Sequence, residues 1–345
     1  MSLLAHRIAT PRRFFSTVRR SVFISQSNDV YANLALEHWL GENFDFKEHQ
    51  VLLLTKNEPC VVLGKQQNPW IEIDADAKVA RRPGDGEAVY QDTGRLNMTF
   101  FTEKDSQDKG YNLAVIARAA FRKFGVKLLQ DGEELNIRHK RISQSCSEIG
   151  DRNALHYCSL LVNTSRPDLE KTLRRQKNLP TSTKFLNLIE ENPKATLNDF
   201  LKAVGFEYLR TKASYLQDGG MALVAKQRGF HLVNPTDEWF PGLRVIKERL
   251  QSWDWCYGAT PKFTMSKSFH NGDVNISVMV EDGRIGDVNL YLSSSFPTSA
   301  FVGMEAMINC LRGSKFREEI FLPFEKFLEE HQELGSKHEK AEASN

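Results

Sequence analysis

The 345-residue sequence lacks three features that would each define a class of protein. It has no run of 18 or more apolar residues, which argues against a transmembrane helix. Its five cysteines are scattered without a Cys-x-x-Cys pair, which excludes a disulfide scaffold or a zinc ribbon. Its 46 basic and 44 acidic side chains leave a net charge of +2, too small for strong attraction to nucleic acid or a membrane surface. What remains is an ordinary globular composition, with 41% hydrophobic residues and a length typical of two domains.

The positive charge is concentrated in the first 28 residues. This segment has five arginines and no acidic residue, and Asp29 is the first carboxylate of the chain. An Arg-rich, Ser-rich and acid-poor start is typical of a mitochondrial transit peptide, whereas a secretory signal needs an apolar core of about 7–15 residues. We predict that residues 1–28 are a transit peptide for the mitochondrial matrix. The alternative is a basic tail without a targeting role.

The rest of the chain mixes helical and strand patterns, which predicts an α+β protein. Apolar residues at helical spacing predict helices at 31–40 and 111–124, and Gly125 provides a stop signal for the second. Two alternating runs around Asp282-Gly283 predict a β-hairpin. Short apolar runs predict strands at 51–54, 60–63, 88–90, 96–101, 135–137, 141–147 and 157–162. Further helices are predicted at 168–175, 197–204, 299–310 and 318–330.

The sequence changes character near Trp253, where the mixed pattern gives way to a hairpin followed by helices. We therefore expect a main domain over 29–248 and a small domain over 249–332. The remaining residues, 333–345, are small, charged and polar, and we expect them to be a disordered tail.

One segment, residues 81–92, has the composition of an anion site. It reads Arg-Arg-Pro-Gly-Asp-Gly-Glu-Ala-Val-Tyr-Gln-Asp. Two cations beside a glycine-containing loop suit a phosphate or carboxylate, because glycine lets backbone N–H groups approach an anion. Asp85 and Glu87 in the same loop would repel that anion. From the residues alone, the segment is either an anion site or a surface turn before a strand.

Two other groups of residues carry possible chemistry. Cys146 lies near basic residues that could lower its pKa and make it a nucleophile, although a buried, inert cysteine is the alternative. His156 and Cys158 are spaced to share one face of a strand. Without further ligands nearby, they predict no metal site.

Five segments resemble, in order and spacing, the lipoate–protein ligase and lipoyltransferase family. Residues 64–70 read Gly-Lys-Gln-Gln-Asn-Pro-Trp, which is similar to the family motif G-[RK]-x-Q-N-P-W, and residues 33–37 resemble its first helix. Residues 81–92 stand in the place of its R-R-x-S-G-G-G-x-V-[YF]-H-D loop, and residues 140–143 in the place of K-[IV]-S-G-x-A. Residues 253–263 resemble its W-x-W-x-[YF]-G-x-[TS]-P-x-F signature.

The resemblance implies a biotin/lipoyl-ligase-type mixed β-sheet catalytic domain with a small α/β C-terminal accessory domain. Residues 231–238 and 311–316 are closer still to the mitochondrial lipoyltransferases of animals. In this family a lipoyl group passes from lipoyl-AMP, or from a lipoylated carrier protein, to a lysine of an acceptor lipoyl domain. Expected partners are the E2 subunits of 2-oxoacid dehydrogenases and the lipoyl-H protein of glycine cleavage. Lipoyl-AMP or the lipoyl group is then a substrate, with no tightly bound cofactor, and we expect a monomer.

The resemblance also assigns site residues. Arg141 would polarise the carbonyl group during transfer. Arg81 and Arg82 would bind the phosphate, and Val61, Leu63, Val89 and Tyr90 would form walls for the acyl tail. The full set expected to bind substrate is Asn68, Arg81, Arg82, Gly84, Gly86, Val89, Tyr90, Gln91 and Ser143.

Several positions depart from the family pattern at the site itself. They are Asp85 and Glu87 in place of glycines, Gly84 in place of serine, Gln91 in place of histidine, Arg95 in place of asparagine, Arg141 in place of lysine and Gln144 in place of glycine. Like charges ~4 Å apart repel by ~1–4 kcal/mol at effective dielectric constants of 80 to 20. Activation of free lipoate with ATP is therefore doubtful.

Three hypotheses follow from these departures. The first is a lipoyltransferase that uses a preformed lipoyl donor, with Arg141 polarising the carbonyl group. The second is a catalytically inactive pseudoenzyme that binds lipoyl domains or lipoylation enzymes. The third is acyl transfer through a thioester on Cys146.

Overall fold

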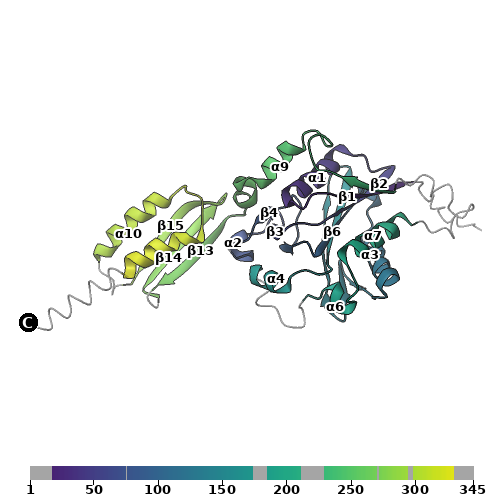
Figure 1. Ribbon diagram of the computed structural model, residues 1–345. Coiled ribbons are helices and arrows are strands. Elements are labelled where there is room, and N and C mark those ends of the chain that lie inside the picture. The colour runs from purple at the N-terminus through teal and green to yellow at the C-terminus, as the bar shows by residue number, and fades with distance from the viewer. Residues whose placement is uncertain are drawn as a thin grey trace, which may run out of the picture.

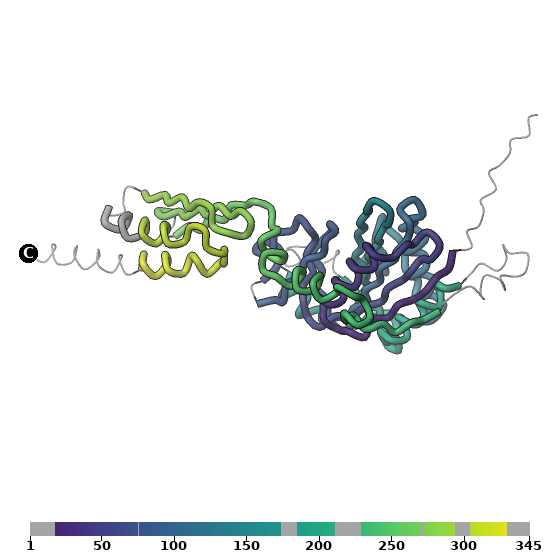
Figure 2. Tube along the Cα trace, turned by 90° about the horizontal axis from the view of Figure 1, so that it is seen from above, coloured from purple at the N-terminus to yellow at the C-terminus, as the bar shows by residue number. Residues whose placement is uncertain are grey.

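Two lobes, each built on its own β-sheet, make up the computed structural model (Figure 1). It describes residues 18–74, 76–173, 185–210, 229–269, 272–293 and 298–329. The expected tail at 333–345 and the first 17 residues lie outside this set. Figure 2 shows the two lobes beside each other along one long axis.

The larger lobe is organised around a six-stranded mixed sheet in the order β10-β11-β6-β2-β1-β12. The strand β1 pairs in parallel with both β2 and β12, and the other neighbours are antiparallel. This confirms the predicted α+β class. The strands are β1 (Arg19–Ser25), β2 (His49–Thr55), β6 (Arg95–Glu103), β10 (Ser143–Ile149), β11 (Asn153–Leu161) and β12 (Gly229–Val233).

Helices cover both faces of this sheet. In β2, Leu52 and Leu54 point into the core under α3 and α7, and Val51 and Leu53 point into the core under α1 and α9. A strand buried on both faces has a continuous apolar sequence, which explains the Val-Leu-Leu-Leu run. The helices are α1 (Val30–Asn43), α3 (Lys109–Phe124), α7 (Leu197–Leu209) and α9 (Leu243–Gln251). The predicted stop of α3 is confirmed, since Gly125 caps it with φ 71°.

Two small sheets and three short helices complete this lobe. The sheet β4-β3-β5 carries the 81–92 segment, and the sheet β7-β8-β9 leads to Arg141. The strands are β3 (Cys60–Leu63), β4 (Val79–Arg81), β5 (Val89–Gln91), β7 (Leu129–Asp131), β8 (Glu134–Ile137) and β9 (Lys140–Arg141). The helices are α2 (Pro69–Glu72), α4 (Arg166–Thr172) and α6 (Leu188–Glu191).

The smaller lobe is an antiparallel sheet covered by helices. The predicted hairpin is confirmed, with Asp282 at φ 50° and Gly283 at φ 68° in its turn. Trp70 of the larger lobe packs into this core, where its ring lies 5.4 Å from that of Phe263 and 5.1 Å from that of Phe316. The elements are β13 (Phe263–Phe269), β14 (Val274–Glu281), β15 (Arg284–Leu292), α10 (Thr298–Leu311) and a helix at 321–329.

The predicted domain boundaries need two corrections. Residues 19–25 were assigned to a transit peptide but form β1, between β2 and β12, with Val22 fully buried. A presequence would therefore have to end before Arg19. The expected boundary at 248/249 falls inside α9, which packs against α1, so the linker begins after Gln251. Just after the linker begins, a helical turn spans Asp254–Gly258 and includes Trp255.

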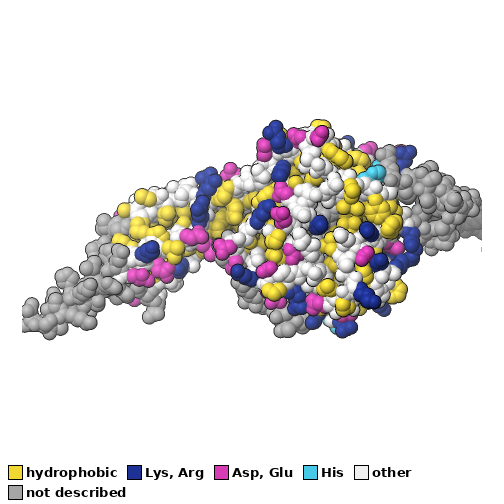
Figure 3. Space-filling model, viewed as in Figure 1, with side chains coloured by type: hydrophobic (Ala, Val, Ile, Leu, Met, Phe, Trp, Pro, Cys, Tyr) yellow, Lys and Arg dark blue, Asp and Glu magenta, His cyan; other side chains and the backbone are white. Residues whose placement is uncertain are grey.

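Charges of both signs are interspersed on the face of the molecule that Figure 3 shows. Within the described ranges, no helix combines the length and the apolar character needed to cross a membrane.

Candidate active site

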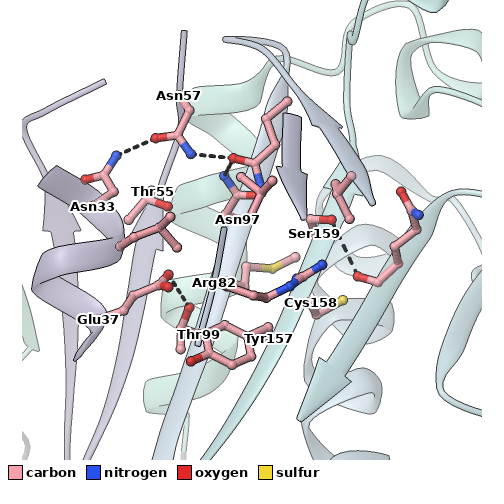
Figure 4. A pocket seen from close by; sticks show the side chains of 16 residues that line it. Asn33, Glu37, Thr55, Asn57, Arg82, Asn97, Thr99, Tyr157, Cys158 and Ser159 are labelled. Carbon is pink, nitrogen blue, oxygen red and sulfur yellow. Dashed lines mark hydrogen bonds between the residues drawn. The ribbon is translucent and has the colours of Figure 1, made fainter. Parts of the chain in front are cut away.

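A cavity of about 40 Å³ lies between α1, the six-stranded sheet and the small sheet β4-β3-β5 (Figure 4). Leu34, Val62, Val89 and Met98 supply its apolar lining, and all other lining side chains except that of Cys158 contain nitrogen or oxygen. In the register of β3 and β5, Val62 lies opposite Val89, so both face the cavity. The space is smaller than a lipoyl chain needs, and binding that chain would require lining side chains to move.

One end of the cavity is a cluster of amide side chains. Asn33 donates to the Oδ1 of Asn57 at 2.7 Å, and Asn57 in turn donates to the Oε1 of Gln91. Asn97 donates to the same Gln91 oxygen at 3.2 Å. Figure 4 shows the first of these hydrogen bonds, from Asn33 of α1 to Asn57. The expected site residue Gln91 therefore lines the cavity, held by side chains that our sequence analysis did not select.

A buried carboxyl group, that of Glu37, lies beside this cluster. The Thr99 hydroxyl donates to its Oε1 at 2.8 Å. Burial raises the pKa of Glu37 to about 7, although Thr99 and the nearby Arg82 act to lower it. Asn33 and Glu37 share one face of α1 because their spacing is i, i+4. Two polar residues at that spacing in the mostly apolar stretch of residues 30–37 were the signal that could have found them.

Glu37 predicts a pH dependence of stability. Because its pKa is raised on folding, the folded protein binds more protons than the unfolded chain between about pH 4.5 and 7. Stability is therefore lost as the pH rises through this window. We expect the free energy of unfolding to fall by about 2–3 kcal/mol more between pH 5 and pH 8 in the wild type than in Glu37→Gln. Urea unfolding at both pH values measures this difference. An equal loss of unfolding free energy between pH 5 and pH 8 in the two proteins would contradict it.

The other end of the cavity is cationic. Arg82 lines it, and its Nη1 donates to the Cys146 sulfur at 3.3 Å while its Nη2 donates to the backbone oxygen of Glu87. Its Nε is buried without a hydrogen-bond partner among the described residues. Arg82 therefore keeps one N–H group available to a ligand in the cavity, and its role in binding substrate stays a prediction.

A second buried arginine, Arg95, supports the same end. It donates to the Tyr90 backbone oxygen at 2.9 Å, to Ser159 at 3.1 Å and to the Oε1 of Gln144 at 2.6 Å. Burial lowers the pKa of Arg95 to about 9. Arg95 does not line the cavity itself, but it holds the side chain of Gln144, which does.

Arg141 lies next to this group, at the edge of the loop formed by residues 83–88. Its Nη2 forms ion pairs with Glu87, at 3.1 Å, and with Glu134. Its guanidinium also lies 5.3 Å from the centre of the Phe185 ring. Gln144, which lines the cavity, donates to the same Glu87 oxygen at 3.2 Å, so Glu87 links Arg141 to the cavity lining.

Arg81, unlike Arg82, is not available to bind the phosphate, although both arginines were expected from the sequence to do so. All three of its guanidinium nitrogens donate to groups of the protein. The acceptors are the backbone oxygens of Gly64, Lys65, Gln67 and Cys256 and the hydroxyl of Thr260. Arg81 therefore ties the 64–70 motif to the linker between the lobes. Successive side chains of a strand point to opposite faces, so Arg81 and Arg82 have different surroundings.

Three further expected site residues lie away from the cavity lining. Tyr90 points to the opposite face of β5 from Val89 and packs with Val61 and Leu63, which were also expected to be walls. The Ser143 hydroxyl accepts from the Leu135 backbone N–H at 2.7 Å. Asn68 caps α2 by accepting from the Trp70 N–H at 3.0 Å. These contacts are all internal to the protein, and the Nδ2 of Asn68, like the Nε of Arg82, is buried without a hydrogen-bond partner among the described residues.

The glycines of the loop have a steric role. A Cβ at Gly86, where φ is 121°, would lie 2.8 Å from the Cβ of Cys146, and one at Gly64 would lie 2.1 Å from the Gly86 oxygen. The oxygen of Gly84 accepts from the Lys65 N–H at 2.9 Å. The loop therefore packs tightly over the 64–70 motif.

Two chemical expectations can be compared with the geometry. Burial raises the pKa of the Cys146 thiol, despite the charge of Arg82, which favours the buried, inert cysteine over the nucleophile. This weakens the thioester hypothesis. Over the described ranges, no group of three or more histidine, cysteine or acidic side chains is placed to hold a metal ion.

Comparisons with known proteins agree with this architecture. A family model of the lipoyl protein ligase A/B catalytic domain matches residues 29–213. The human mitochondrial lipoyl amidotransferase is 35% identical over 309 residues, which cover 80% of this chain and 78% of the human protein. The chain belongs to the lipoyl protein ligase A/B family, as the resemblance indicated.

Solved structures share the fold. Plasmodium falciparum LipL1 in complex with lipoate matches with a TM-score of 0.61 and 22% identity, covering 89% of this chain and 94% of that one. The bipartite lipoate protein ligase of Thermoplasma acidophilum, studied with its E2 lipoyl domain, matches with a TM-score of 0.56 and 17% identity. That match covers 71% of this chain and 98% of the archaeal one.

Proposed function

We propose that this lipoyl-transferring acyltransferase accepts its lipoyl group from a lipoylated carrier protein or from lipoyl-AMP. It delivers the group to a lysine in the lipoyl domain of a 2-oxoacid dehydrogenase E2 subunit. The observation that carries the proposal is the clustering of arginines at one end of the cavity, in a chain of this family. Arg82 lines the cavity, Arg95 donates to the lining residue Gln144, and Arg141 is linked to Gln144 through Glu87. Such positive charge suits the oxyanion that forms during acyl transfer.

The proposed reaction is a direct attack by the acceptor. The acceptor lysine amine forms a bond to the lipoyl carbonyl carbon, and the bond from that carbon to the donor's leaving group breaks. With a carrier protein as donor, the leaving group is a lysine amine, and the proton lost by the acceptor amine is gained by it. Arg141 stabilises the negative charge on the carbonyl oxygen, and Arg82 orients the lipoyl group beneath the loop of residues 83–88.

Relatives and sequence together support the proposed partners and location. A related ligase was studied with an E2 lipoyl domain, and the human relative is a mitochondrial protein. We therefore place the protein in the mitochondrial matrix, with E2 lipoyl domains as acceptors and the lipoyl-H protein as a donor. The substrates are lipoyl groups, with no tightly bound cofactor, and the working unit is a monomer. The pseudoenzyme alternative is not favoured, because the relatives of this chain are transferases and ligases.

A transfer assay tests the proposal. The protein without its first 17 residues is incubated with an unlipoylated E2 lipoyl domain and either a lipoyl-H protein or lipoyl-AMP. We expect the mass of the acceptor to increase by one lipoyl group with at least one donor. An acceptor with its target lysine replaced by arginine is the control and should gain no mass. No gain with either donor, from a protein that still binds the lipoyl domain, would contradict transfer and support the pseudoenzyme alternative.

A further inference from the structure

One carboxylate of the chain already occupies the cationic end of the site. The Oε2 of Glu87 accepts from the Nη2 of Arg141 at 3.1 Å and from the Nε2 of Gln144 at 3.2 Å. The side chain of Glu87 is 58% exposed and that of Arg141 is 21% exposed. Glu87 therefore lies at the mouth of the cavity, where an incoming donor would meet it.

The amide of Gln144 is oriented so that each of its ends faces a group of opposite charge. Its carbonyl oxygen faces the buried cation Arg95 at 2.6 Å, and its amide nitrogen faces the carboxylate of Glu87. A reversed amide would place its N–H groups against a guanidinium and its oxygen against a carboxylate. Gln144 thus connects a buried positive charge to the negative charge at the mouth.

The connected residues are also those that depart from the family pattern. Glu87, Gln144 and Arg95 each replace a different residue type in the resembling motifs, and they contact one another in sequence-distant pairs. A change at only one of these positions would leave the charge of Arg95 or of Glu87 without its Gln144 partner. Three changes that satisfy each other form one site with a different ligand preference.

We propose that Glu87 is a specificity-determining residue, an internal anion that occupies the place between Arg141 and Gln144 and selects against donors with a negatively charged leaving group. The inference rests on the proposed function and narrows its donor. A lipoyl phosphate-type donor would have to displace the carboxylate or lie beside it, and like charges at close range repel. A lipoyl group in amide linkage to a lysine brings no charge to this place, so a lipoylated carrier protein fits it.

A binding experiment tests the proposal without depending on turnover. The ligands are lipoyl-sulfamoyl-adenosine, which is an anionic and stable analogue of lipoyl-AMP, and Nε-lipoyl-lysine, whose linkage is a neutral amide. Isothermal titration calorimetry compares the wild type with Glu87→Gln, which keeps the side-chain volume and removes the charge. We expect the variant to bind the adenosine analogue at least tenfold more tightly and Nε-lipoyl-lysine within twofold of the wild type.

A matched control separates this local effect from the net charge of the loop. Asp85 is exposed in the same loop and contacts no other described residue through a hydrogen bond or ion pair, so Asp85→Asn should change either dissociation constant by less than twofold. Unchanged affinity of Glu87→Gln for the analogue, or an equal gain in Asp85→Asn, would overturn the proposal. Absence of transfer from a lipoylated carrier would instead refute the proposed function, because the affinity ratio is measured independently of transfer.

Discussion

Replacing Arg141 by glutamine is expected to lower the rate of lipoyl transfer by about 10²–10³, the loss typical of removing one oxyanion donor. Arg141 is the cation at the mouth of the cavity, and it reaches this place from β9 with its guanidinium over the Phe185 ring. A neutral amide cannot balance the negative charge that develops on the carbonyl oxygen. Steady-state kinetics with a lipoyl domain as acceptor should show the loss in kcat, with a smaller change in KM.

Arg141→Lys is the informative control for that loss. Both ion pairs of Arg141 use the same nitrogen, Nη2, so a single ammonium group can replace it. We expect the lysine variant to retain activity within tenfold of the wild type. Equal losses in the lysine and glutamine variants would show that the shape of the guanidinium, and not its charge, is required.

The second large effect concerns the start of the folded chain. A protein that begins at residue 29 is expected not to fold, because it lacks β1. Without this strand, β2 and β12 lose their shared neighbour. The buried Val22 is removed from the core, and Arg20 no longer donates to the Tyr111 hydroxyl at 2.9 Å. Circular dichroism and urea unfolding should show no cooperative transition for this truncated protein.

A protein that begins at residue 18 is the matched control. It keeps every contact of β1 in the described structure, including the bond between Ser21 and His49 at 2.8 Å. We expect it to unfold cooperatively with the stability of the full chain. A folded protein starting at residue 29 would contradict the assignment of β1 to the domain and would restore the longer presequence.

The 64–70 motif and Arg81 connect the two lobes. Arg81 joins the 64–70 motif to the linker by donating to the Cys256 oxygen at 2.9 Å. Trp70, at the end of the same motif, packs in the core of the smaller lobe. One short motif therefore contacts both lobes and also supports the loop over the cavity, where the Lys65 N–H donates to the Gly84 oxygen.

The sequence by itself determined the family, the α+β class and many local elements of the fold. Motifs such as residues 64–70 identify the family because their residue types are needed at fixed positions, whether for packing or for caps. The hairpin at Asp282-Gly283 and the end of α3 at Gly125 were predictable because each depends on a positive φ within a few residues. From the sequence alone, charge also predicted that carboxylates in the 81–92 segment would repel an anion bound there.

Only the tertiary structure decided which of these residues work together. Arg81 and Arg82 are neighbours in sequence, yet the guanidinium of Arg81 donates to backbone oxygens whereas Arg82 lines the cavity. The direction of the Cys146 pKa shift depended on its burial, and the role of residues 19–25 depended on the strands beside them. Strand alternation fixes the period of a pattern, but contacts between distant segments decide which face is buried. For the same reason, the pairing of Glu87 with Arg141 and Gln144 emerged only when three separate parts of the chain came together.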